Sequence, residues 1–222
     1  VIKGELASIT DTQLLAGLNY AVLGNEILQF RDAVLQSDGT YTLSYFLRGR
    51  FGTEWAIGTH ALYEEFTLLS EASVQRVLVD ENTIGAKRYY KAVTLGATVD
   101  ASITKTFTFA AVGLRPYAPV HLKGTRDTSN NLTITWVRRT RYGGEWRDSV
   151  DVPVGEASEN YDVDIINGSS VVVRTITATS QTASYTAAQQ TTDGLTPGNP
   201  VHVKIYQRSA TVGRGTAAEA FI

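Results

Sequence analysis

The chain has 222 residues, 43% of them hydrophobic and 19% charged, a composition that indicates a folded protein of one large or two ordinary domains. Its net charge of −2 leaves no basic footprint for nucleic acid or an anionic membrane, and no apolar run approaches the roughly 20 residues that span a bilayer. Because Cys is absent, disulfides, thiolate zinc sites and a Cys nucleophile are excluded. The chain begins with Val1 and contains no Met, so we expect a piece of a longer protein.

The first half of the chain contains one well-marked β-hairpin. Apolar residues alternate with polar ones along Thr40–Leu47, and the run Glu26–Leu35 has the same period of two residues. Between them lies Ser37–Gly39, in which Gly39 can take the positive φ that a tight turn requires. The pattern predicts two antiparallel strands joined at this turn.

Further strands and two short helices are predicted before residue 113. The strands are expected at Val74–Val79, Arg88–Leu95 and Ser102–Phe109. Thr53 is expected to cap a helix over Glu54–Ala61, because a threonine hydroxyl can accept from the free N–H groups of a first turn. A turn or two of helix is also expected within Asp11–Leu18.

A domain boundary is predicted at Gly113–Pro119, where two prolines disfavour both helix and central strand. It divides the chain into a β-rich unit of residues 1–115 and a second unit of residues 116–222. Regular alternation after the boundary predicts about seven short strands separated by turns, which is typical of a two-sheet sandwich. They are expected at Val120–Gly124, Leu132–Trp136, Tyr161–Ile165, Val171–Thr177, Ala183–Ala187, Val201–Ile205 and within Ala210–Ile222.

The second unit resembles fibronectin type III domains. Those domains have a core tryptophan in the second strand, as Trp136 would be, and a third strand led by tyrosine, as Tyr161 would be. They also have a leucine-proline-glycine turn, which Leu195–Gly198 matches. A tyrosine usually follows that turn, but this chain has Val201, so we expect the tyrosine-corner hydrogen bond to be missing. The fold class expected for the chain is therefore all-β, a β-rich N-terminal unit followed by a fibronectin type III-like β-sandwich.

A 24-residue insertion, Val137–Asn160, separates the second and third predicted strands of the sandwich. Part of it is basic and aromatic, and aromatic and arginine side chains are enriched at binding hot spots. A contact loop would use Arg139, Arg141, Tyr142, Trp146 and Arg147. The favoured alternative is a structural extension in which the tryptophan packs on the sandwich and the arginines pair with nearby acids.

Much of the chain also resembles the C-terminal part of tailed-phage tail proteins, from about Tyr20 to Ile222. The matching segments are Asn19–Phe30, Tyr41–Glu54, Val93–Gly96 and Gly113–Leu122, and the run LRGRFGTE at Leu47–Glu54 is the most specific. That group includes host-specificity or tail-tip hub proteins and the tail protein of gene transfer agents. The resemblance implies a tail-hub-like domain over residues 1–115 and a virion component at the tail tip, assembled in the bacterial cytoplasm. It also implies other tail proteins and copies of the chain as partners, with a trimer expected, and contact with a host-surface glycan as a further role.

Arg48 and Arg50 alternate with glycines in this most specific run. One interpretation is that they anchor a neighbouring subunit or domain through salt bridges. The other, which we favour, is a structural turn in which both arginines bond to nearby carbonyls and carboxylates.

Residues that could carry catalysis are sparse and scattered. His60, His121 and His202 fall in different predicted elements, and no helix-spaced histidine pair or phosphate-binding glycine loop occurs. Glu64-Glu65 could in principle supply paired carboxylates for glycoside hydrolysis, and Asp162 with Asp164 could contribute to a calcium site. Neither set is sufficient, so we expect a non-enzyme that folds without metal or cofactor.

Two other functions remain open at this point. One is a glycan-binding adhesive module of a bacterial surface protein, and the other is an accessory domain of a secreted polysaccharide-degrading enzyme. A gene neighbourhood with a cell-wall anchor would favour the first, and glycan turnover by the parent protein alone would favour the second.

Overall fold

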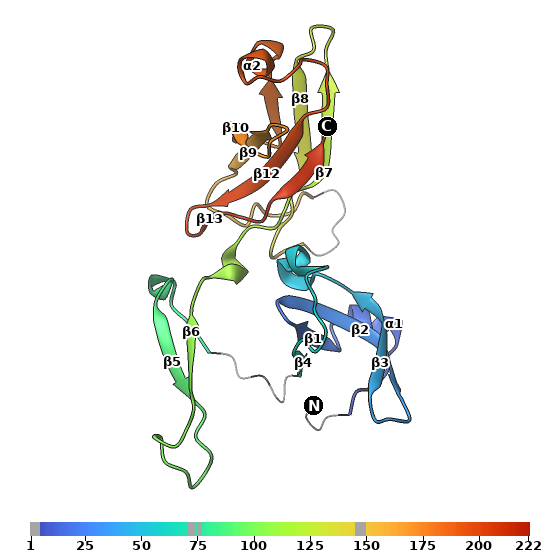
Figure 1. Cartoon of the computed structure of the whole chain (residues 1–222), viewed down its shortest axis with the longest axis vertical. Helices are drawn as coiled ribbons and strands as arrows, with labels where there is room; N and C mark the ends of the chain where they lie inside the picture. Colours follow the sequence, from blue (N-terminus) through green and yellow to red (C-terminus); the bar gives the residue numbers. More distant parts are fainter. Residues whose placement is uncertain (1–4, 71–73, 75–76, 145–149) are drawn as a thin grey trace.

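The computed structural model describes residues 5–70, 74, 77–144 and 150–222. The chain folds into antiparallel β-sheets with few helices, which confirms the expected all-β class (Figure 1). No helix among the described residues is long and apolar enough to span a membrane. Three bodies follow one another along the chain: a four-stranded sheet, a two-stranded arm and a sandwich.

The first body is the N-terminal sheet, whose strands lie in the order β3-β2-β1-β4. Its strands are β1 (Tyr20–Leu23), β2 (Glu26–Leu35), β3 (Tyr41–Leu47) and β4 (Phe66–Leu69). The predicted hairpin is confirmed by the pairing of β2 with β3. The core of this sheet is small and contains the buried residues Ala21, Leu28 and Phe30. The helix α1 (Asp11–Leu15) precedes the sheet and begins at a capping box formed by Thr10 and Gln13.

The helix predicted after Thr53 is shorter than expected. The structure has a single 3-10 turn directly after Thr53, η2 (Glu54–Ala56), in place of the expected helix. Another 3-10 turn, η1 (Arg50–Gly52), directly precedes Thr53. The Thr53 hydroxyl does not cap a helix, because it donates to the Arg50 carbonyl (2.8 Å) and accepts from the Ile27 N–H (3.0 Å). Thr53, which was expected to cap a helix, therefore links the turn η1 to β2 by hydrogen bonds.

The second body is the arm, which we define as residues 77–110. It contains the turn η3 (Glu81–Thr83) and a hairpin of β5 (Lys87–Lys91) with β6 (Thr104–Thr108). Both strands are shorter than the predicted Arg88–Leu95 and Ser102–Phe109. The strand predicted at Val74–Val79 is wrong, since its described residues are in no strand. No residue of the arm is buried.

The turn η4 (Val112–Leu114) leads into the sandwich, in the segment where the domain boundary is predicted. The division at residue 115 itself stays a prediction. The sandwich has one sheet in the order β11-β8-β7 and another in the order β10-β9-β12, in which β13 and β14 both pair with β12. This is a fibronectin type III-like arrangement of two antiparallel sheets. The strands are β7 (Val120–Arg126), β8 (Leu132–Val137), β9 (Tyr161–Ile166), β10 (Val172–Ala178), β11 (Thr182–Tyr185), β12 (His202–Ser209), β13 (Gly213–Arg214) and β14 (Ala218–Phe221).

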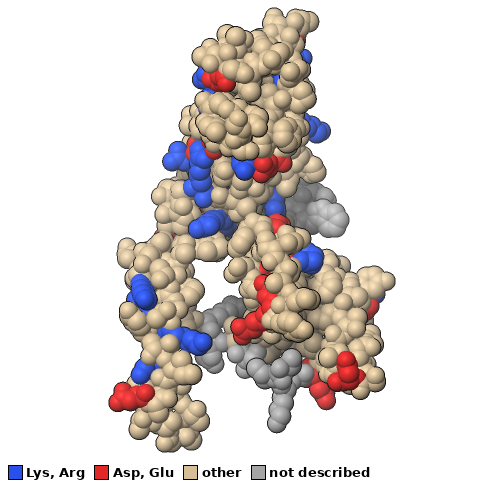
Figure 2. Space-filling view, in the orientation of Figure 1, with Lys and Arg blue, Asp and Glu red and all other residues tan. Residues whose placement is uncertain are grey.

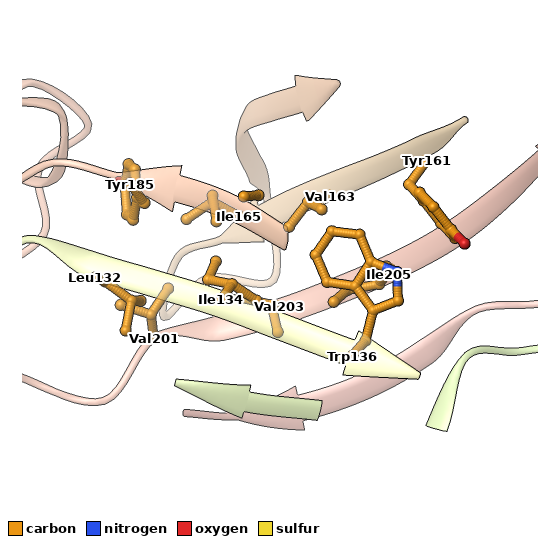
Figure 3. Close-up of a cluster of buried hydrophobic side chains, with 11 residues drawn as sticks. Leu132, Ile134, Trp136, Tyr161, Val163, Ile165, Tyr185, Val201, Val203 and Ile205 are labelled. Carbon is orange, nitrogen blue, oxygen red and sulfur yellow. The ribbon is translucent and has the colours of Figure 1, made fainter. Parts of the chain in front are cut away.

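The main core of the molecule lies between the two sheets of the sandwich (Figure 3). Alternate residues of β8 and β12 point inward, as the period of two residues predicts. Trp136 lies in β8 and Tyr161 begins β9, the places that the resemblance implies for them, and their rings meet edge to face with centroids 5.0 Å apart. Burying each large apolar side chain stabilises the fold by about 1.5–3 kcal/mol.

A short helix closes the sandwich where the missing tyrosine corner would lie. Val201 is buried in the core, so no hydroxyl is present at that position. The helix α2 (Ala187–Thr192), which we did not predict, carries the fully buried Gln190. Its side-chain amide donates to the carbonyls of Asn130 (2.9 Å) and Tyr185 (3.0 Å), while Arg126 donates to its oxygen (3.1 Å). These hydrogen bonds of a buried side chain therefore add to the packing that holds the sandwich together.

Candidate interaction site at the joint between the N-terminal sheet and the sandwich

The N-terminal sheet and the sandwich meet at a small set of polar and aromatic residues, which we call the joint: Gly52, Glu54, Gly113, Tyr117, Arg139, Arg141 and Glu156. Arg139, just beyond β8, donates from Nη2 to Oε1 of Glu54 in η2 at 2.6 Å. Its guanidinium also lies over the Tyr117 ring, 5.0 Å from the centroid. These contacts join residues that are far apart in the sequence, so they set how the two bodies meet.

Tyr117 is the aromatic centre of the joint. A Cβ placed on Gly52 would lie 2.5 Å from Cε1 of this ring, and Gly52 has a φ of +79°. Position 52 therefore needs glycine for both the close approach and the backbone conformation. Burial raises the pKa of the Tyr117 hydroxyl, with Arg139 acting in the opposite direction.

Arg141 ties the insertion loop to the linker. Its Nη2 donates to Glu156 (2.9 Å) and to the Gly155 carbonyl (3.2 Å), and its Nη1 donates to the Gly113 carbonyl (3.3 Å). Glu156 is almost fully buried, with 7% of its side chain exposed. The arginine therefore holds both ends of the loop against the segment that enters the sandwich.

Only part of the contact loop predicted from the sequence is exposed to solvent. Arg139 and Arg141 pair with Glu54 and Glu156 of the same chain, while the Tyr142 side chain is exposed. Trp146 and Arg147 lie outside the described residues, so the contact role of the loop stays a prediction.

A second polar cluster lies next to the joint and surrounds Glu26, whose side chain is fully buried. Arg48 donates to both carboxylate oxygens at 2.7 and 2.6 Å, and the Gly49 N–H donates at 2.7 Å. The hydrogen bonds from Arg48, helped by that from Gly49, lower the pKa of Glu26 from 4.5 to about 2, although burial acts against them. Arg48 therefore serves its own chain, and its role as a subunit anchor stays a prediction.

His60 extends this cluster. Its Nε2 lies 2.7 Å from Glu26 and its Nδ1 lies 2.6 Å from Glu64. Both ring nitrogens can donate only when the imidazole is protonated, and the two carboxylates raise the pKa of His60. The cluster fixes the loop after η2 to the start of β2.

Arg50 lies between this cluster and the joint. Its Nη2 donates to the Tyr20 hydroxyl at 3.1 Å, and the Tyr20 ring packs against Phe51 with centroids 5.2 Å apart. Like Arg48, it makes contacts within the N-terminal unit, and a role as anchor for another subunit stays a prediction.

The two acids considered for calcium are occupied by an arginine. Arg214 donates to Asp162 at 2.8 Å and to both oxygens of Asp164 at 2.6 and 3.0 Å. These hydrogen bonds raise the pKa of the arginine. No group of three or more potential metal ligands occurs among the described residues. Within that part of the chain, the two carboxylates thus form an ion-pair cluster that stabilises β9 against β13.

Sequence reasoning singled out the arginines of the joint but missed their partners. Glu54 was expected only as the first residue of a predicted helix, and Tyr117 was not singled out. Both residues lie inside segments that carry the tail-protein resemblance, which is the one signal that could have found them. Glu26 and Arg48 of the second cluster also lie inside such segments, whereas His60 and Glu64 lie outside them and had no such signal.

Part of the chain matches a known protein family. Residues 1–67 match the family described as Rcc01698-like, C-terminal. The match covers less than half of the chain; it contains β1, β2, β3, η1 and η2, and it ends within β4. A search of curated proteins finds no match.

Solved structures of low similarity include tandem extracellular domains. The extracellular region of rat CD45, domains d3–d4, is 14% identical, with a TM-score of 0.36 over 90% of this chain and 96% of that chain. The FN5 domain of Drosophila Lar is 14% identical, with a TM-score of 0.28 over 48% of this chain and 95% of that chain. At such scores neither likeness says anything about function.

Proposed function

We propose that this chain is a non-enzymatic structural component of the tail tip of a phage or gene-transfer-agent particle. The N-terminal sheet would be built into the tip, and the joint would hold the sandwich in a set position on it. Other tail proteins and copies of the chain are the proposed partners. The virion tail tip is the proposed location, after assembly in the bacterial cytoplasm.

One observation carries the proposal. The run Leu47–Glu54, the most specific part of the resemblance to tail proteins, supplies the two devices that organise the structure. Its Arg48 pairs with the buried Glu26, and its Gly52 and Glu54 form the joint with Tyr117 and Arg139. The family match over residues 1–67 includes this run. A segment that fixes one folded body to another suits a structural subunit, which must hold its domains in set positions within a large assembly.

The proposal can be tested in the source organism by removing the coding region for residues 5–222 from the parent gene. We expect particles whose tails lack a complete distal tip in negative-stain electron micrographs, and we expect the wild-type gene to restore it. A second strain should lack only residues 116–222, and should keep the tip while losing density projecting from it. Complete tips in the first strain would contradict the proposal.

A second candidate, glycan contact by the sandwich, is favoured by one surface feature. A shallow concavity of about 270 Å³ lies beside β12 and β14, and Phe221 and His202 are among its lining residues. The Phe221 side chain is 74% exposed, and its ring stacks on His202 with centroids 4.4 Å apart. Calorimetric titration with host-surface saccharides should give binding that Phe221→Ala removes and Tyr142→Ala leaves unchanged. Equal loss in both variants would contradict it.

A further inference from the structure

The arm has the surface of a protein segment that is covered by a partner. Seven of its large apolar side chains are more than half exposed, and they are Val77, Leu78, Tyr89, Leu95, Val99, Ile103 and Phe107. A two-stranded hairpin on its own is at best marginally stable in water. Exposed apolar surface of this extent marks an interaction site in a soluble protein.

The charge of the hairpin indicates what the partner carries. The strands β5 and β6 contain four basic residues and no acid, and the basic residues are Lys87, Arg88, Lys91 and Lys105. Residues 5–70, which include the N-terminal sheet, contain eight acidic and three basic residues, a net charge of −5. The two bodies are thus electrostatically complementary.

The N-terminal sheet also offers a free edge. In the order β3-β2-β1-β4, the strand β4 is terminal, and among the described residues no strand pairs with its outer side. Glu64 and Glu65 directly precede β4, and Tyr63 beside them is fully exposed with a φ of +64°. The strand β4 has four residues and each hairpin strand has five, so the strands are similar in length. An unpaired edge of this kind is a template for strand addition.

Within one chain these two surfaces do not pair. The hairpin is a separate two-stranded sheet, and no hydrogen bond between described residues joins β5 or β6 to another strand. The arm and the N-terminal sheet stand apart over most of their length in Figures 1 and 2, with open space between them in the space-filling view. A second copy of the chain can supply what the first lacks.

We propose that the β5–β6 hairpin of one copy adds to the open β4 edge of the N-terminal sheet of a second copy. Main-chain hydrogen bonds would extend the four-stranded sheet to six strands, and Lys105 and its basic neighbours would face the acids before β4. This contact is the surface by which two copies of the chain would join. It rests on the proposed function only in that the tail tip is the assembly in which the copies would meet.

The absence of cysteine allows a clean test of this contact in the purified chain. Thr106→Cys places one thiol on β6, and Thr67→Cys places one on β4, and both threonines are exposed. When the two single variants are mixed and oxidised, any disulfide joins two chains. We expect the Thr106→Cys and Thr67→Cys pair to crosslink several-fold more than Thr106→Cys with Thr177→Cys, a control on β10. Equal yields would overturn the proposal.

Charge reversal tests the specificity of the same contact. Adding Lys105→Glu to the β6 variant should lower the crosslinked fraction, and adding Glu65→Lys to its β4 partner should restore it. Restoration excludes a general effect on folding, whereas a reduction that Glu65→Lys leaves uncorrected would overturn the pairing. The test uses purified chain, so its failure leaves the tail-tip proposal, which is tested on particles, standing.

Discussion

Arg139 in the sandwich and Glu54 in the N-terminal sheet unit form an ion pair with Nη2 and Oε1 2.6 Å apart, across 85 residues of sequence. The pair is about one-third exposed, so by itself it contributes on the order of 0.2–1 kcal/mol. Its position gives it importance beyond that energy. Together with the stacking of Arg139 on Tyr117, it is a specific contact that resists movement of the sandwich against the sheet.

Arg139→Ala should loosen the joint with little effect on the core of either body. Loss of about 1 kcal/mol of combined ion-pair and cation–π energy raises the population of alternative arrangements about five-fold. Spin labels at Thr67→Cys and Thr177→Cys would report this as a broader distance distribution in pulsed electron resonance. Lys204→Ala, which removes a similarly exposed ion pair within the sandwich, is the control. Identical distance distributions in the wild type, Arg139→Ala and Lys204→Ala would show that Arg139 does not fix the position of the sandwich relative to the N-terminal sheet.

Gly52→Ala should disturb the joint by steric contact. Both Gly52 and Gly58 have positive φ, so alanine at either position costs about 1–2 kcal/mol in backbone strain. Only at Gly52 would the new Cβ meet Tyr117, whereas no atom lies within 4 Å of a Cβ at Gly58. We expect Gly52→Ala to lower the free energy of unfolding by about 1–3 kcal/mol more than Gly58→Ala in denaturant titrations. This excess should disappear in a Tyr117→Ala background, and its persistence there would contradict the explanation.

Glu26→Gln should destabilise the N-terminal sheet by about 3 kcal/mol, because it removes the buried partner of Arg48. The pH dependence follows from the lowered pKa. The stabilisation is fully present above pH 4.5 and is lost as the pH falls through about 2. Denaturant midpoints measured from pH 6 to pH 2 should therefore fall more steeply for the wild type than for Glu26→Gln. Parallel curves would show that folding does not change the pKa of Glu26, and would contradict stabilisation of its ionised form by Arg48.

His60 should give a pH dependence of the opposite sign. Its pKa is raised by Glu26 and Glu64, so its contribution is fully present below the ordinary value of 6.5 and is lost as the pH rises through the folded-state pKa. His60→Gln should remove this slope, and Glu64→Gln should reduce it. Both variants are compared with the wild type by denaturant midpoints from pH 5.5 to pH 9. An unchanged slope in His60→Gln would assign the effect to another group.

Arg214→Ala should destabilise the sandwich by about 3 kcal/mol, since it removes the main cationic partner of two nearly buried carboxylates and leaves Asp164 only its hydrogen bond from Thr175. The same geometry predicts that calcium or a chelator will not shift the melting temperature of the wild type. A matched control is Arg208→Ala, whose longer 3.7 Å contact reaches only Asp162. A large shift on adding chelator to the wild type would contradict the assignment of these acids to Arg214.

Sequence alternation predicted the hairpin of the N-terminal sheet and the strands of the sandwich, but it missed the other two strands of the N-terminal sheet. The hairpin of β2 and β3 was found because each strand is long enough to show a period of two residues. β1 and β4 have four residues each and were missed, whereas β11, which is equally short, was found among the regularly spaced strands of the sandwich. The helix α2 could have been found from the Thr186 and Gln189 capping box, which α1 repeats at Thr10 and Gln13.

The joint was harder to predict than the elements that form it. Arg139 and Arg141 were singled out from the composition of their loop, but composition carries no information about a partner such as Glu54, 85 residues away. Tertiary folding also overrode local preference at Thr53, where pairing to β2 replaced the expected helix cap. Such long-range polar contacts depend on the three-dimensional structure.

The central claim is that this chain belongs to the tip of a tail, and immunogold electron microscopy tests it most directly. Antibodies raised against the purified chain would be applied to particles from a lysate of the source organism. We expect gold at the distal end of tails and none on particles from a strain lacking the coding region. Gold on cell envelopes, with tails unlabelled, would contradict the account and favour a surface adhesin.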